Sequence, residues 1–142
     1  GQDIGVKFKL NQWYHIAIVV DGSKTIAYVN GKKVTEYGSS GSLGEFYIGR
    51  SYSDGRGIVA RFSELRLWKV ARTATQIKDG IYDVSPTDSG LYAYWKMSKV
   101  KNNKIPDASG NNRDLILRGQ AGKEGRQTIK LHEEEKGVKI TE

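Results

Sequence analysis

The strongest hydrophobic pattern in the chain is the run Trp13–Val20, which the turn dipeptide Asp21-Gly22 closes. Aromatic and β-branched residues dominate the run, and these residue types favour extended strands. Both alternating sets of side chains are apolar, as in strands that have no solvent-facing side. The pattern therefore predicts a central strand that is covered on both faces.

A hairpin is predicted immediately after this strand. The segments Thr25–Val29 and Lys32–Val34 flank the dipeptide Asn30-Gly31. Asn-Gly favours a type I′ turn, in which both central residues adopt positive φ. This dipeptide between two apolar segments is the clearest turn signal in the sequence.

A long strand is predicted from Ile58 to Trp68. Leu65 and Leu67 share one side of it, which we expect to face a core. Glu64 and Arg66 share the other side, one pleat apart, where they are able to pair.

Shorter segments complete the β pattern. Strands are predicted over Leu43–Ile48, Leu91–Lys96, Asp114–Leu117 and Thr128–Leu131. Turn-rich loops are predicted over Ser51–Gly57 and Asp107–Asn112, because Gly, Ser, Asn and Asp favour turns.

The sequence predicts one helix, from Thr73 to about Tyr82. Thr73 is a suitable N-cap, and Gln76 follows at the spacing of a capping box. Ile77 and Ile81 lie four residues apart and therefore on the same helix face.

These elements predict an all-β, antiparallel fold with one short helix. The length of 142 residues suits one domain, and the 17 Gly fit many tight turns. Cys is absent, so neither disulfides nor thiol chemistry are available. No apolar run approaches the roughly 18 residues that a membrane-spanning helix needs.

The order of the segments carries a resemblance. The segments are Trp13–Gly22, Ala27–Lys32, Phe46–Gly49, Phe62–Trp68, Ala71–Thr73, Gln76-Ile77, Gly90–Trp95 and Asp107–Asn111. Over about residues 6–117 this order resembles the laminin-G-like jelly roll of pentraxins and of the concanavalin A-like lectins and glucanases. It is similar to C-terminal modules of Bacteroidetes surface lipoproteins.

The resemblance implies an antiparallel β-sandwich of the jelly-roll type over residues 1–119, followed by a tail, residues 120–142, with short terminal strands. In the family, the strand that resembles Trp13–Val20 lies in the middle of the domain. The chain therefore corresponds to the C-terminal portion of the family domain. Three explanations are open for the missing N-terminal portion. The chain has been trimmed, a companion domain or second copy completes the sandwich, or the chain is a compact variant. The first two are favoured.

Catalysis is not expected. Glucanases of this fold pair two carboxylates about 5 Å apart on one strand, and no such set occurs here. Glu64 has Arg66 as its neighbour, and Glu133–Glu135 form a consecutive, solvated run. His15 lies in an apolar strand, and we therefore expect it to be a core histidine whose hydrogen bonds are satisfied rather than a catalytic residue.

A calcium site is the candidate cofactor site. Asp107, Asn111, Asn112 and Asp114 place oxygen donors in a Gly-containing loop, and Ca²⁺ prefers such ligands. The same residue types favour turns for backbone reasons alone, so both explanations stay open.

Glycan binding requires an exposed aromatic ring with polar groups beside it. The candidates are Tyr52 with Arg50 and Asp54 on the long loop, and Tyr37 after the hairpin. Trp13, Trp68, Tyr92, Tyr94 and Trp95 are expected to be core or inter-sheet residues.

The chain is basic, with 23 Lys and Arg against 16 Asp and Glu. Sulfated or uronic-acid polysaccharide suits such a charge, and no nucleic-acid recognition motif accompanies it. The expected function is non-catalytic binding of cell-surface or extracellular polysaccharide. The alternative is a structural or adhesion module that contacts protein, and the resemblance implies export.

The loop assignment predicts that Tyr52→Ala abolishes glycan binding, because the ring would supply the stacking surface. Affinity electrophoresis through glycan-containing gels measures this, and unchanged retardation of the variant would remove the site.

Overall fold

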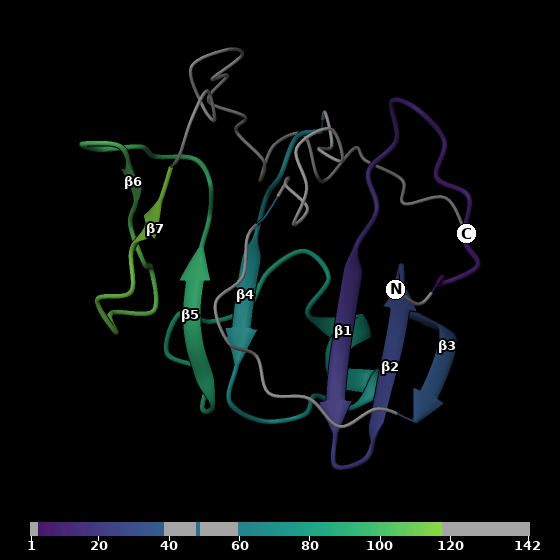
Figure 1. The fold of residues 1–142 in the computed structure, drawn as a ribbon. Coiled ribbons are helices and arrows are strands. Elements are labelled where there is room, and N and C mark those ends of the chain that lie inside the picture. The colour runs from purple at the N-terminus through teal and green to yellow at the C-terminus, as the bar shows by residue number, and fades with distance from the viewer. Residues whose placement is uncertain (1–2, 39–47, 49–59, 118–142) are drawn as a thin grey trace.

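The computed structural model describes residues 3–38, 48 and 60–117 (Figure 1). Its elements are β1 (Ile16–Asp21), β2 (Lys24–Val29), β3 (Lys32–Gly38), β4 (Leu65–Trp68), α1 (Ala74–Asp79), β5 (Leu91–Trp95), β6 (Lys104–Ile105) and β7 (Leu115–Ile116). All strand pairs are antiparallel and form the sheets β1-β2-β3, β4-β5 and β6-β7. The predicted all-β fold with one short helix is thus confirmed for the described residues.

The β2–β3 hairpin turns at Asn30 and Gly31, as the sequence predicts. Their φ angles are 51° and 76°, so both residues adopt the left-handed conformation. The Asn30 side-chain oxygen accepts a hydrogen bond from the His15 N–H at 3.0 Å, and the Asn30 N–H donates to the His15 carbonyl at 2.8 Å. The turn is therefore tied to the residue that precedes β1.

The strand β1 begins at Ile16, three residues later than the predicted start, and ends at Asp21. On one face Val19 packs with Tyr28 and with Ile77 of α1. On the other face Ile16, Ile18 and Val20 are 52%, 55% and 47% exposed. The prediction that both faces are covered is wrong for the described part of the chain, because α1 covers one face only.

The predicted strand Ile58–Trp68 is shortened to β4, Leu65–Trp68, among the described residues, which here begin at Ala60. The cause is Glu64, whose φ of 53° is left-handed and interrupts the extended backbone. Leu65 and Leu67 nevertheless face a core, as predicted.

The helix α1 begins with the predicted capping box. The Thr73 side chain accepts from the Gln76 N–H, and the Gln76 side chain accepts from the Thr73 N–H. The helix ends at Asp79 rather than Tyr82, because Gly80 leaves the helical conformation as the C-cap. Ile77 is buried, as its position on the apolar face requires.

A second core lies between β4–β5 and β6–β7. Ala93, Trp95 and Ile105 form its buried centre, with Leu65, Leu67 and Leu115 among the residues packed against it. The strand β5 matches the predicted strand up to Trp95, and β7 lies within the predicted Asp114–Leu117. The strand β6 was not predicted, because its two residues carry no periodic pattern.

The helix α1 joins the two larger sheets. Figure 1 shows it behind β1 and β2. Ile77 packs on β1 and β2, and the Gly80 carbonyl accepts a hydrogen bond from Arg66 Nη1 of β4. The predicted strand Thr128–Leu131, the tail 120–142 and all of Leu43–Ile48 except Ile48 lie outside the described residues. No helix within the described ranges is long and apolar enough to cross a membrane.

His15 differs from the histidine expected from the sequence. It is partly buried, and its Nδ1 has no hydrogen-bond partner among the described residues. Burial, and secondly the positive charge of Arg66, lower the pKa of His15 from 6.5 to about 4.

The pKa of His15 predicts acid destabilisation. The unfolded chain binds the proton more readily than the folded protein, so the stability due to neutral His15 is complete above pH 6.5 and is lost as pH falls from 6.5 through about 4. By pH 4.5 the loss should be roughly 2 kcal/mol. Urea unfolding of the wild type and of His15→Gln at pH 7 and pH 4.5 measures it. An equally large loss in the variant would contradict the assignment.

Candidate functional site

The surroundings of Glu64 differ from those of a hydrolase carboxylate, because a cation and a phenol contact it in a buried position. Its carboxylate accepts from Arg66 Nη2 at 2.9 Å and from the Tyr94 hydroxyl. The side chains of Arg66 and Glu64 are 7% and 11% exposed. The predicted Glu64–Arg66 pair is therefore present, and it is buried.

Tyr94 extends this cluster. Its hydroxyl also lies 3.3 Å from Asp83 Oδ1, so two carboxylates share one phenol. Burial, and secondly the hydrogen bond to Glu64, raise the pKa of Tyr94 above its usual range. The neutral Tyr94 phenol and the ion-paired Glu64 carboxylate hold the sheet and the helix together. This arrangement stabilises the fold and is poorly suited to catalytic proton transfer.

Asp107 organises the loop that follows β6. Its Oδ1 accepts from the backbone N–H of Tyr94 at 2.9 Å and from the N–H and hydroxyl of Ser109, and its Oδ2 accepts from the Arg113 N–H at 3.1 Å. Partial burial alone would raise the pKa of Asp107, but these hydrogen bonds together lower it. The loop is thereby attached along β5.

The predicted calcium ligands are placed by the same loop. Asn111 Nδ2 donates to the carbonyls of Leu91 and Tyr92 at 3.3 and 3.1 Å, and Asp114 Oδ1 accepts from the Asp107 N–H. Asn112 adopts a left-handed φ of 58°. Within the described residues no group of three or more His, Asp or Glu side chains could hold a metal ion. Calcium binding by these four residues stays a prediction.

An exposed aromatic ring lies beside this loop. Tyr92 of β5 is 39% exposed, although the sequence predicted a core or inter-sheet residue. The Arg113 guanidinium lies 3.9 Å from the ring centroid, and the Lys69 ammonium lies 5.9 Å from it. Cations at these distances interact with the face of an aromatic ring. Two segments far apart in the sequence thus bring positive charge to one exposed ring.

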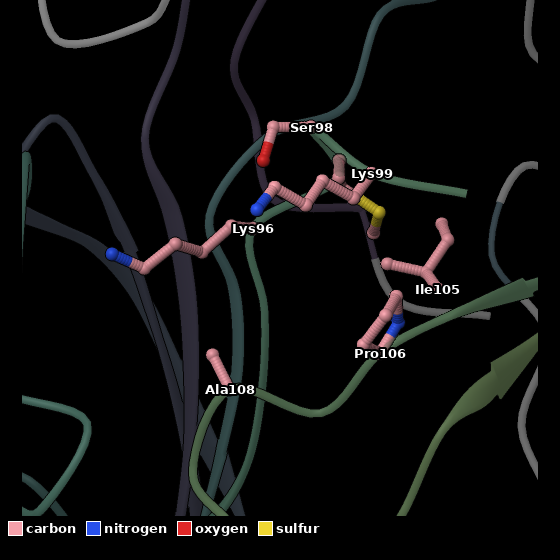
Figure 2. A pocket seen from close by; sticks show the side chains of 7 residues that line it. Lys96, Ser98, Lys99, Ile105, Pro106 and Ala108 are labelled. Carbon is pink, nitrogen blue, oxygen red and sulfur yellow. The ribbon is translucent and has the colours of Figure 1, made fainter. Parts of the chain in front are cut away.

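A shallow pocket of about 190 Å³ lies beyond the end of β5 (Figure 2). Its lining residues are Lys96, Met97, Ser98, Lys99, Ile105, Pro106 and Ala108. Figure 2 shows the Lys96 side chain extending away from Ile105 and Pro106. The pocket therefore has an apolar floor with lysines at its border.

The sequence located only part of this arrangement. Tyr52, Arg50 and Asp54 lie outside the described residues, and Tyr37 is a partly buried residue of β3 opposite Thr25. Tyr94 and Trp95 are buried, as predicted. In the sequence, Arg113 is distinguished only by its positive charge. Its proximity to Tyr92 has no signal in the sequence, because 21 residues separate the two.

Comparisons with known proteins agree with the fold. Residues 2–78 match the family model of the concanavalin A-like lectin/glucanases superfamily. No curated protein matches the chain.

Two solved structures are similar. One is a "putative carbohydrate binding protein" from Bacteroides ovatus ATCC 8483, with 32% identity, a TM-score of 0.64 and coverage of 79% of this chain. The chain spans 38% of that protein's length. The other is an S-layer domain-containing protein from Clostridium thermocellum ATCC 27405, with 24% identity and a TM-score of 0.46 over 53% of this chain and 42% of that one.

The buried ion pair predicts a large effect of Glu64→Gln. The substitution keeps the side-chain shape but leaves the Arg66 charge buried without a counter-ion, which should cost about 3–5 kcal/mol of unfolding free energy. Urea denaturation measures the change.

The matched control is Glu36→Gln, because Glu36 pairs with Lys24 and Lys33 on the surface. Exposed pairs contribute little, so the control should be nearly as stable as the wild type. Equal, small effects of the two substitutions would show that the buried pair is not structural.

Proposed function

We propose that this chain, which belongs to the concanavalin A-like lectin/glucanases superfamily, binds polysaccharide without cleaving it. The observation that carries the proposal is the partly exposed Tyr92 ring, with the Arg113 guanidinium 3.9 Å and the Lys69 ammonium 5.9 Å from its centroid. An aromatic face binds the apolar side of a sugar ring, and neighbouring donors bind its hydroxyl groups. The likeness to the Bacteroides ovatus protein over 79% of the chain supports the same function.

The environment of Glu64 supports binding without turnover. A retaining or inverting glycosidase needs two carboxyl groups that flank the substrate, one of them protonated. Glu64 instead pairs with Arg66, and both side chains are about nine-tenths buried. We therefore assign Glu64 to the fold rather than to chemistry.

The place of action follows from the ligand class. The ligand class is cell-surface or extracellular polysaccharide, so the module would act outside the cell or on its surface. Calcium at the loop of Asp107, Asn111, Asn112 and Asp114 remains a separate proposal, for which the oxygen-rich side chains are the support.

A second candidate function is a structural or adhesion module. Ile16, Ile18 and Val20 form an apolar row on one face of β1. Such rows on a protein surface are typical of sites that contact another protein or domain. A module of this kind would contact protein and would not be retarded in glycan gels.

The glycan proposal predicts that Tyr92→Ala lowers affinity by about fivefold to 150-fold, because stacking on an aromatic ring contributes about 1–3 kcal/mol. Affinity electrophoresis against a panel of neutral and acidic polysaccharides measures this. Tyr92→Phe should bind like the wild type, because the aromatic face remains.

Tyr82→Ala is the matched control, since Tyr82 is 45% exposed and lies after α1. A reducing-sugar assay on the same mixtures should show no release. Retardation of no polysaccharide would overturn the proposal, and released reducing ends would overturn its non-catalytic part.

A further inference from the structure

Arg113 is held in place before any ligand arrives. Its backbone N–H donates to Asp107 Oδ2 at 3.1 Å, and its carbonyl accepts from Trp95 Nε1 at 2.7 Å. Its side-chain Nη1 donates to the Tyr92 carbonyl at 3.1 Å, and its guanidinium lies on the Tyr92 ring. A side chain fixed in this way loses little conformational entropy when it binds.

The other donors of this guanidinium remain available. The hydrogen bonds of the Arg113 side chain within the described residues use Nη1 alone, which leaves Nε and Nη2. These two groups form the edge of the guanidinium that matches two oxygens of a carboxylate or a sulfate. No carboxylate of the described residues forms an ion pair with Arg113 or with Lys69.

We infer that the Tyr92 site binds an acidic polysaccharide, with a carboxylate or sulfate of one sugar held by Arg113 and Lys69 and the sugar ring placed against Tyr92. This inference rests on the proposed function and specifies its ligand class. A neutral sugar would leave the two cations without an anionic partner, whereas a carboxylate or sulfate supplies one for both.

The surroundings favour a polymer with repeated charges. Lys96 follows the last residue of β5, about 13 Å from Tyr92 along an extended strand. Lys96 and Lys99 border the apolar pocket there. The chain as a whole has a formal net charge of +7. A polyanion that follows β5 meets cations at both of its ends.

The test compares acidic polysaccharides with their uncharged counterparts. Polygalacturonate and methyl-esterified pectin test the carboxylate, and dextran sulfate and dextran test the sulfate. Affinity electrophoresis gives dissociation constants for the wild type, Arg113→Gln, Arg113→Lys, Lys69→Gln and the control Lys32→Gln. Lys32 is an exposed residue of β3 and its substitution changes the net charge by the same amount.

We expect the wild type to bind one or both acidic polymers and to bind their uncharged counterparts at least tenfold more weakly. Arg113→Gln should weaken binding about tenfold to a hundredfold, because a charge-assisted hydrogen-bonded pair is lost. Arg113→Lys should also weaken binding, since an ammonium cannot donate two parallel hydrogen bonds to a carboxylate or sulfate as a guanidinium does. Lys69→Gln should weaken binding less, and Lys32→Gln should have almost no effect.

Four results would overturn the inference. Equal binding of acidic and uncharged polymers would refute acid recognition but leave the proposed function standing. Equal losses from Arg113→Gln and Lys32→Gln would show attraction by overall charge rather than a site. Equally tight, Arg113-dependent binding of single-stranded DNA would show that the site selects anions and not sugars. If no polysaccharide is bound at all, the proposed function fails together with the inference.

Discussion

The arrangement of the described elements depends on the contacts of one buried group, the guanidinium of Arg66. It pairs with Glu64, donates to the Gly80 carbonyl at the end of α1 and lies 5.2 Å from the Tyr94 ring centroid. Through Gly80 it fixes the helix, and Ile77 of that helix packs on β1 and β2. A buried cation is tolerated only with such partners. The left-handed backbone at Glu64, which costs about 1–3 kcal/mol, is what brings its carboxylate to Arg66.

Asp107 has the corresponding role for the candidate binding site. Its carboxylate collects donors from β5 and from its own loop, and this places Arg113 over Tyr92. A residue that looks like a metal ligand in the sequence therefore acts as a hydrogen-bond centre for the backbone. The site consists of one strand residue, one loop residue and Lys69 after β4, and each is positioned by a contact between distant segments.

The two faces of the β1–β2–β3 sheet have different environments. One face packs on α1 through Ile77, whereas Ile16, Ile18 and Val20 on the other remain about half exposed. Burial of these three side chains would stabilise any contact at that face by roughly 25 cal/mol per Å² of apolar surface removed from water. The same face carries Tyr37, so a contact there would also include a residue that the sequence proposed for glycan binding.

Local rules account for the parts of the fold that the sequence predicted. Asn30-Gly31 determined the hairpin because only a few residue types accept positive φ, and Thr73 with Gln76 determined the helix start because their side chains reach the free N–H groups. Alternation placed Leu65 and Leu67 toward a core, and the order of the segments identified the family. Tertiary structure alone decided that Glu64 interrupts its strand, that Tyr92 is exposed and that Arg113 lies on its ring. These features depend on contacts between residues far apart in the chain, whose energies no periodicity or turn dipeptide records.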